Sequence, residues 1–185
     1  MGKRFFNALS WMKAIIFALM GVILIRTFVL TPVLVSGKSM YPTLNDGDMV
    51  ILWELGNRLE LFDVVVFENV EEEYFIKRLI GLPGQTISYE QGQLFIDGYF
   101  IDEPFLPQGP LWENTAGTRD FTHQDICVLN ALAACSHIPE GYYLVLGDNR
   151  RISEDSRHLG LIHESQILGT VSWIQWPMDR MGIIR

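Results

Sequence analysis

At the centre of the chain stands an apolar stretch with one lysine in its middle, Tyr74-Phe75-Ile76-Lys77-Arg78-Leu79-Ile80-Gly81. A short apolar run of this kind, followed by the turn signal Pro83-Gly84, is typical of a β-strand. Alternate residues of a strand share a face, so we expect Phe75, Lys77 and Leu79 on one side. The stretch therefore predicts a strand that holds a lysine among apolar neighbours.

Similar short runs recur along the chain, bounded by turn signals such as Asn45-Asp46-Gly47 and Gly147-Asp148-Asn149. Many short strands at close spacing predict a mainly β fold with a barrel-like or coiled antiparallel sheet. Residues 91–139 differ, since they are rich in Gly, Pro and Asn with one candidate helix near residues 125–134, and we interpret them as a small inserted lobe. The expected strands are residues 33–35, 48–52, 63–67, 74–80, 86–89, 94–96, 142–146 and 167–174.

An apolar N-terminal segment precedes this body. Residues 14–25 are all apolar or glycine, and residues 11–30 supply the about 20 residues that a membrane-spanning helix needs. Lys3, Arg4 and Lys13 predict a cytoplasmic N-terminus with the body on the outer side. The expected division is a cytoplasmic tail (1–10), a single transmembrane anchor (11–32), a β-rich core (33–90 and 140–185) and the inserted lobe (91–139).

Charge and cysteine content exclude several function classes. The net charge is −8, and the first acidic residue is Asp46, so the body after the anchor is acidic. Nucleic-acid binding needs a basic surface and is not expected. Cys127 and Cys135 are the two cysteines and belong to no metal-binding spacing, so no metal or cofactor is expected. They can pair outside the cytoplasm, but their spacing leaves the pairing open.

Ser39 follows the apolar segment, in Ser36-Gly37-Lys38-Ser39-Met40-Tyr41-Pro42-Thr43-Leu44. Gly37 permits close backbone approach, and Pro42 restricts the residue before it to extended geometry. Both features suit a held, exposed serine, although a plain turn is the alternative. Burial of Lys77 would lower its pKa from the usual value of about 10.4 and make it a candidate general base. The alternative for Lys77 is a solvated edge-strand lysine.

A third segment, Gly147-Asp148-Asn149-Arg150-Arg151-Ile152-Ser153-Glu154-Asp155-Ser156-Arg157, is dense in groups able to orient other groups. With residues 39–44 and 77–84, and after an apolar N-terminal segment, it resembles type I signal peptidase in its Gram-positive-like form. This family consists of membrane-bound serine proteases that remove signal peptides from exported proteins. The resemblance covers residue 11 to the C-terminus, with a looser match over 91–139.

The resemblance implies a role for each matching residue. Ser39 is the nucleophile and Lys77 its general base, while Ser153 hydrogen-bonds and orients the lysine amine. Asp155 and Arg157 support that loop. The Ser39 N–H stabilises the oxyanion, and no second donor is identified, because Gly37 stands where some members have a serine. Shallow pockets for small P1 and P3 residues are expected to be lined by Val33, Val35, Met40, Leu44, Phe75 and Ile76.

The resemblance also implies location and partners: a single-pass protein of the plasma membrane, in contact with the lipid bilayer and the secretion machinery, that acts on signal-peptide-bearing precursors. A catalytically idle signal-peptidase-like assembly factor, for example in pilus biogenesis, is one alternative. A self-cleaving repressor of the LexA type is another, although it predicts a DNA-binding domain before the protease. A secreted β-domain whose N-terminal segment is cleaved near residues 33–36 is a third.

Overall fold

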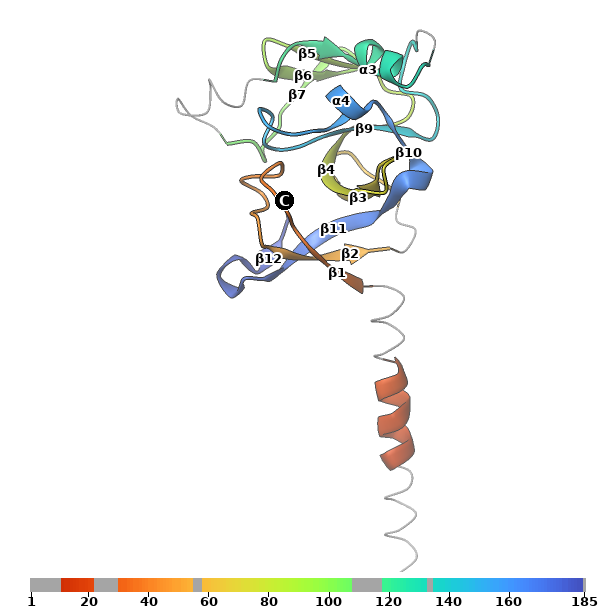
Figure 1. Cartoon of the computed structure of the whole chain (residues 1–185), viewed down its shortest axis with the longest axis vertical. Coiled ribbons are helices and arrows are strands. Elements are labelled where there is room, and N and C mark those ends of the chain that lie inside the picture. Colours follow the sequence, from red (N-terminus) through yellow and green to blue (C-terminus); the bar gives the residue numbers. More distant parts are fainter. Residues whose placement is uncertain (1–10, 22–29, 55–57, 108–117, 133–134, 185) are drawn as a thin grey trace, which may run out of the picture.

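The structure, a computed structural model, describes residues 11–21, 30–54, 58–107, 118–132 and 135–184. It is mainly β, and its strands pair antiparallel in two sheets (Figure 1), as the sequence predicts. The larger sheet has eight strands in the order β1-β2-β11-β3-β4-β9-β10, with β12 paired to β11. Its strands are β1 (Leu30–Leu34), β2 (Met49–Trp53), β3 (Val64–Glu68), β4 (Tyr74–Gly81), β9 (Tyr142–Leu146), β10 (Ile162–His163), β11 (Ile167–Trp176) and β12 (Gly182–Ile183).

Strands β3 and β4 form the middle of this sheet. Residues 64–67 of β3 and 77–81 of β4 are buried on both faces, which explains why the apolar residues of these strands do not alternate with exposed polar ones. Val64 and Val66 belong to one core cluster, whereas Val65 and Phe67 belong to another. Residues of β4 are therefore placed between two packed layers, where an ionisable side chain loses its hydration.

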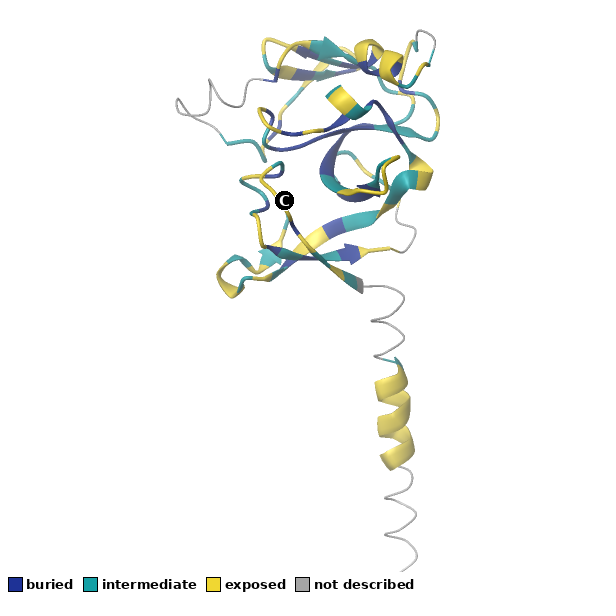
Figure 2. Ribbon diagram, viewed as in Figure 1, coloured by how far each residue is buried: buried dark blue, intermediate teal, exposed yellow. Residues whose placement is uncertain are grey.

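The second sheet has four strands in the order β7-β6-β5-β8, with β5 (Ile87–Glu90), β6 (Gln93–Ile96), β7 (Tyr99–Ile101) and β8 (Phe121–Thr122). It lies over the β4 and β9 end of the larger sheet (Figure 1). One core cluster joins the two, because Ile87 and Tyr89 of the small sheet are buried together with Ile80 and Leu144 of the large one. Figure 2 shows this buried layer between the sheets.

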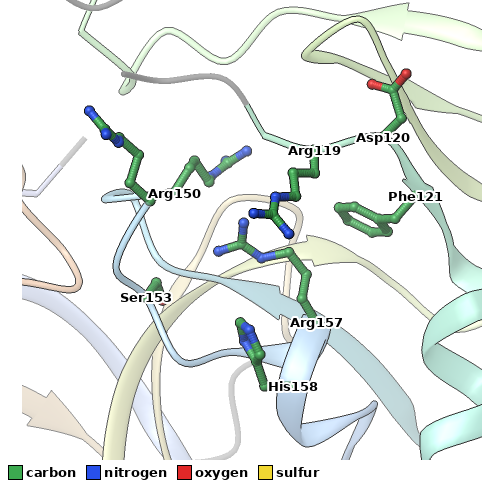
Figure 3. A pocket seen from close by; sticks show the side chains of 8 residues that line it. Arg119, Asp120, Phe121, Arg150, Ser153, Arg157 and His158 are labelled. Carbon is green, nitrogen blue, oxygen red and sulfur yellow. The ribbon is translucent and has the colours of Figure 1, made fainter. Parts of the chain in front are cut away.

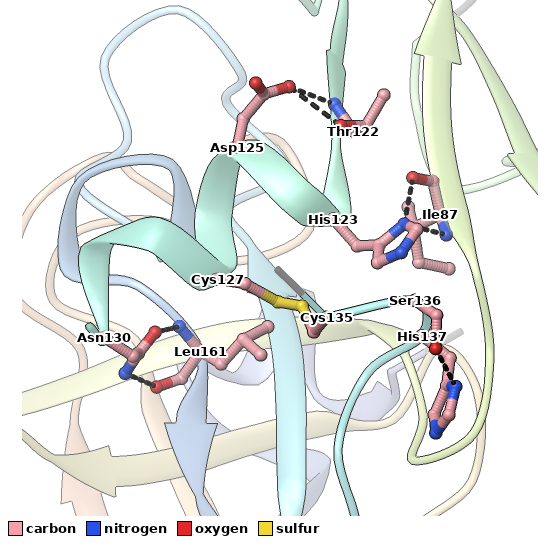
Figure 4. Close-up of a disulfide and its surroundings, with 10 residues drawn as sticks. All are labelled: Ile87, Thr122, His123, Asp125, Cys127, Asn130, Cys135, Ser136, His137 and Leu161. Carbon is pink, nitrogen blue, oxygen red and sulfur yellow. Dashed lines mark hydrogen bonds between the residues drawn. A yellow bond between two sulfur atoms is a disulfide. The ribbon is translucent and has the colours of Figure 1, made fainter. Parts of the chain in front are cut away.

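The helices of the body are short: α3 (His123–Leu129), α4 (Ser156–Leu159), and the 3-10 turns η1 (Glu164–Gln166) and η2 (Met178–Arg180). Helix α3 begins and ends earlier than the expected helix near residues 125–134. Cys127 of α3 forms a disulfide with Cys135 (Figure 4), with Cα atoms 6.3 Å apart. The spacing of the two cysteines in the sequence left this pairing open. Asn130 then joins this region to Leu161, its side chain accepting at 2.6 Å from the N–H and donating at 3.0 Å to the carbonyl.

Strand β1 begins earlier than the expected strand at residues 33–35. Leu30, Thr31 and Pro32, which the sequence places in the anchor, pair with β2. The end of the apolar segment is therefore extended and part of the sheet. Strand β1 is at the edge of the sheet, where Pro32 is tolerated because it has no N–H to donate.

The N-terminal segment is described in part. Residues 11–21 are helical, and their large apolar side chains, such as Trp11 and Phe17, are exposed (Figure 2). Residues 1–10 and 22–29 of the expected tail and anchor lie outside the described residues. Within the described ranges, no helix combines the length and apolar character needed to cross a bilayer. The transmembrane helix and the four-part division of the chain stay predictions.

Candidate active site

Ser39 and Lys77 are in direct contact. The Lys77 Nζ lies 3.0 Å from the Ser39 Oγ and 3.0 Å from the Ile76 carbonyl oxygen. Lys77 is placed by β4 and is 2% exposed, while Ser39 is half-buried in the loop after β1. The structure thus brings together a hydroxyl and an amine from positions 38 residues apart, at a separation suited to proton transfer.

Burial controls the charge of Lys77. Loss of hydration lowers the pKa of the Lys77 amine from 10.5 to about 8, and the negative charges of Asp155, Glu154 and Asp148 only partly oppose this shift. The Phe75 ring, whose centroid lies 5.0 Å from Nζ, forms part of this surrounding. Near neutral pH a substantial minority of the enzyme molecules therefore carry an unprotonated amine, the form that can accept the Ser39 proton.

The segment around Ser39 is held by its neighbours on both sides. Met40 and Leu44 are buried in the core, so the chain on the C-terminal side of Ser39 cannot move freely. The Ser39 carbonyl accepts a hydrogen bond of 2.9 Å from the Asn149 N–H. Arg180 donates to the Thr43 carbonyl at 3.0 Å from the opposite side. A serine held this way keeps its hydroxyl pointed at the lysine without a helix or strand of its own.

A buried ion pair joins the three segments quoted from the sequence. Arg78 follows Lys77 in β4 and donates from Nε and Nη2 to the two carboxylate oxygens of Asp148, at 2.9 and 2.7 Å. The Asp148 carboxylate also accepts a hydrogen bond from the Thr43 hydroxyl, and the Phe105 ring covers the Arg78 guanidinium at 4.0 Å. The lysine strand, the serine loop and the third segment are thereby fixed to one another.

The third segment forms the loop between β9 and α4. Asp155 caps α4 and accepts two hydrogen bonds of 2.8 Å from Arg157, so these two residues form an ion pair. Burial opposes ionisation of Asp155, but the hydrogen bonds and charge of Arg157 and the Gly147 N–H hold the pKa of this carboxyl below its usual value. Arg150 links the loop to the small sheet, through the Gly147 carbonyl on one side and Glu103 and Tyr89 on the other.

Ser153 is buried in the same loop, at 4% exposure. Its hydroxyl makes no hydrogen bond with Lys77, so the bond expected between these two residues is not formed in this structure. The hydroxyl instead lies by the Asp155 carboxylate and helps to lower the pKa of that group. The space around it is closed by Gly147, where an added Cβ would lie 2.5 Å from the Ser39 carbonyl oxygen and closer still to the Ser153 Oγ. Glycine is therefore required where the loop packs against the serine segment.

A cleft of about 430 Å³ opens onto Ser39 and Lys77. The end of β1 and residues 35–38 form one wall, and residues 73–77 form the other. Of the expected pocket residues, Val33, Val35, Met40, Phe75 and Ile76 line the cleft. Leu44 does not line it: this side chain is fully buried in the core cluster that also contains Val35 and Met40, so it supports the wall from inside.

Comparison with known proteins decides the family. The profile of the family described as signal peptidase, peptidase S26, matches residues 8–176. The chain belongs to the signal peptidase, peptidase S26, family. Signal peptidase IB of Staphylococcus aureus strain Mu50 is 38% identical over 180 residues, covering 92% of this chain and 91% of the relative. Signal peptidase I S of Bacillus subtilis strain 168 is 37% identical over 178 residues, covering 95% and 92%.

A solved structure is also similar, the crystal structure of a signal peptidase I from Enterococcus faecalis V583. It has 32% sequence identity and a TM-score of 0.49, and the match covers 62% of this chain and 97% of that chain. Membership of the signal peptidase family makes this chain a protease, and the mainly β architecture agrees with the fold that the sequence predicts.

Some residues that organise this signal peptidase site are not among the candidates derived from the sequence. Arg78 and Asp148 are the main pair, and Thr43, Asn149 and Arg150 add backbone or side-chain contacts to it. The sequence does contain one indication of this pair: Arg78 lies inside an apolar strand, where an arginine needs a buried anion as its partner. The third segment contains three carboxylates, on Asp148, Glu154 and Asp155, and the sequence does not indicate which one reaches Arg78.

Replacing Asp148 by alanine should leave the Arg78 guanidinium buried without its partner. We expect the free energy of unfolding to fall by about 3–5 kcal/mol, measured by urea denaturation. The exposed carboxylate Asp179 provides the matched control, and Asp179→Ala should change stability by no more than about 0.5 kcal/mol. Removing both charges, with Arg78→Met and Asp148→Leu, should restore part of the loss. A loss for Asp148→Ala as small as that of the control would contradict the account.

Proposed function

We propose that this protease is a membrane-bound serine endopeptidase that cleaves signal peptides from exported precursors, with Ser39 as nucleophile and Lys77 as general base. The observation that carries the proposal is the 3.0 Å contact between the Lys77 Nζ and the Ser39 Oγ, in surroundings that lower the pKa of the amine to about 8. Residues 33–90 and 140–185 would form the catalytic core, and residues 11–32 the membrane anchor.

In the proposed mechanism, the segment to be cut lies extended beside residues 33–37, with small side chains in the cleft. Neutral Lys77 takes the proton of the Ser39 hydroxyl as Oγ attacks the scissile carbonyl carbon. The Ser39 N–H faces the developing oxyanion. The Lys77 ammonium then gives its proton to the departing amine, which leaves an ester on Ser39. A water molecule, deprotonated by Lys77, attacks this ester, and the proton returns to Ser39 when the acid is released.

The loop between β9 and α4 would position the base. Ser153 is the proposed orienting partner of the lysine amine, since its hydroxyl is buried in the loop that packs against the Ser39 segment at Gly147. Rotation about its Cα–Cβ bond changes the direction in which it can donate. Asp155 and Arg157 would keep this loop in place through their ion pair. The alternative is a catalytically idle assembly factor. Such a protein would not need a serine hydroxyl in contact with a neutral lysine amine.

The membrane location is proposed from the apolar surface near the N-terminal segment. Strand β1 continues directly from that segment, and β2, β11 and β12 lie beside it (Figure 1). These elements and the turn η2 expose large apolar side chains, which suit an interface with lipid better than water: Leu34, Trp53, Trp173, Trp176, Met178, Met181 and Ile183. The cleft would then open near the surface from which a signal peptide emerges.

The roles of the two central residues are tested by substitution. Ser39→Ala should abolish cleavage of a purified precursor. Lys77→Met keeps the length of the side chain but removes the base, and should lower kcat by at least about 10²-fold. Ser172→Ala, on the exposed face of β11, is the matched serine control and should cleave at the wild-type rate. Wild-type cleavage by Lys77→Met, in a protein with an unchanged melting temperature, would refute the assignment of the base.

The anchor is tested by fractionation. The full chain should stay with the membranes after alkaline washing. Phe17→Lys combined with Leu19→Lys should release it, because each charge at the centre of a spanning helix costs about 2.5–3.5 kcal/mol. A pair of lysines at exposed Gln93 and Gln124, in β6 and α3 of the small lobe, controls for added charge and should leave the protein in the membrane. Recovery of the unmodified chain in the soluble fraction would overturn the anchor.

A further inference from the structure

A second hollow, of about 600 Å³, lies on the other side of the loop that carries Ser153. Its walls come from the start of β8 in the small lobe and from α4 and the residues before it. Figure 3 labels Arg119, Asp120, Phe121, Arg157 and His158 in its lining, and Arg151 lines it too. Ser153 also borders this hollow, but no step of the proposed mechanism uses Arg119 or Arg151. We call this hollow the cationic pocket.

The charge of the cationic pocket contrasts with the rest of the body. The chain carries a net charge of −8, yet several arginines gather here. Arg157 is paired with Asp155, but Arg119 and Arg151 are exposed and form no ion pair with any described residue. Arg119, Arg151 and Arg157 line the same hollow, and Figure 3 shows the carboxylate of Asp120 pointing away from the guanidinium groups of Arg119 and Arg157. Arginines that line one hollow without a carboxylate partner attract an anion.

The pocket is connected to the active-site cleft. A small hollow of about 310 Å³ shares Arg151 and His158 with the cationic pocket. The same hollow shares Ile152 and Glu154 with the cleft. The shared residues therefore place the cationic pocket next to the cleft, across the loop at Ile152.

We propose that the cationic pocket binds the carboxylate side chain of an acidic residue in the mature part of the precursor, shortly after the cleaved bond. This proposal rests on the proposed function. A carboxylate matches the planar fork of donors that Arg119 and Arg151 offer, and Phe121 supplies an apolar surface for the methylene groups. An anionic lipid fits less well, because α4, which carries Arg157 and His158, lies near the small lobe and away from β1, where the N-terminal segment ends (Figure 1).

Peptide binding tests the proposal without relying on cleavage. Fluorescently labelled peptides would carry an Ala-x-Ala segment followed by two aspartates or by two asparagines, moved one position at a time over the first six residues after the cleavage point. The probe protein is the Ser39→Ala variant. At the best position, the aspartate peptide should bind about fivefold more tightly than the asparagine peptide, as expected for one or two exposed ion pairs. High salt should reduce this difference.

The two unpaired arginines should carry this preference. In Arg119→Gln combined with Arg151→Gln the two peptides should bind equally, with the affinity of the asparagine peptide unchanged. Arg58→Gln, an exposed arginine elsewhere on the surface, is the matched control and should keep the fivefold preference. Equal binding of both peptides to the parent protein, or a preference that survives the double substitution, would overturn the proposal. The proposal would also be overturned by a double variant that keeps the preference for the aspartate peptide but no longer binds vesicles of anionic lipid.

Cleavage of the asparagine peptide by the unmodified enzyme is measured separately. The double arginine variant should cleave this neutral peptide at the unmodified rate, since neither arginine touches Ser39 or Lys77. Failure of the unmodified enzyme to cleave it would count against the proposed function alone, because the binding comparison would still report on the cationic pocket.

Discussion

Everything in this site depends on keeping one amine out of water. Lys77 is held in the middle of the sheet by β4, at 2% exposure, and the cost of burying its charge is what suits it to the proposed role of base. Three carboxylates nearby favour the ammonium form, but burial is the larger effect, and the pKa falls to about 8. If Lys77 were more exposed, the same acidic residues would keep its amine protonated, and a protonated amine cannot accept a proton from Ser39.

The surrounding structure holds the partner of this amine in place. Ser39 has no regular element of its own, so its position is fixed by buried Met40, by the Asn149 N–H and by the Arg78–Asp148 pair that ties strand to loop. Arg150 extends the same network to the small lobe. The lobe is therefore linked to the active-site loop by charge and by a shared core, and its outer edge supplies one wall of the cationic pocket.

Local patterns predicted much of this fold. The expected strands agree with β2, β3, β4 and β9 to within about two residues, since turn residues and apolar runs act over short distances. Strands β8, β10 and β12 were not expected, because each has two residues and exists through its pairing partner. At the site, the Ser39–Lys77 contact follows from the segments that resemble signal peptidases. The choice of Asp148 as the partner of Arg78, 70 residues away, depends on the folded chain.

The most direct test of the account is a titration of Lys77 itself. The chain has lysines at positions 3, 13, 38 and 77, so their side-chain ε-carbon signals can be followed by NMR after isotope labelling, and Lys77→Met identifies the signal of interest. We predict that the Lys77 signal titrates with a pKa of about 8. A Lys77 midpoint at the usual lysine value of about 10.4 would contradict the central claim that burial makes this lysine a base.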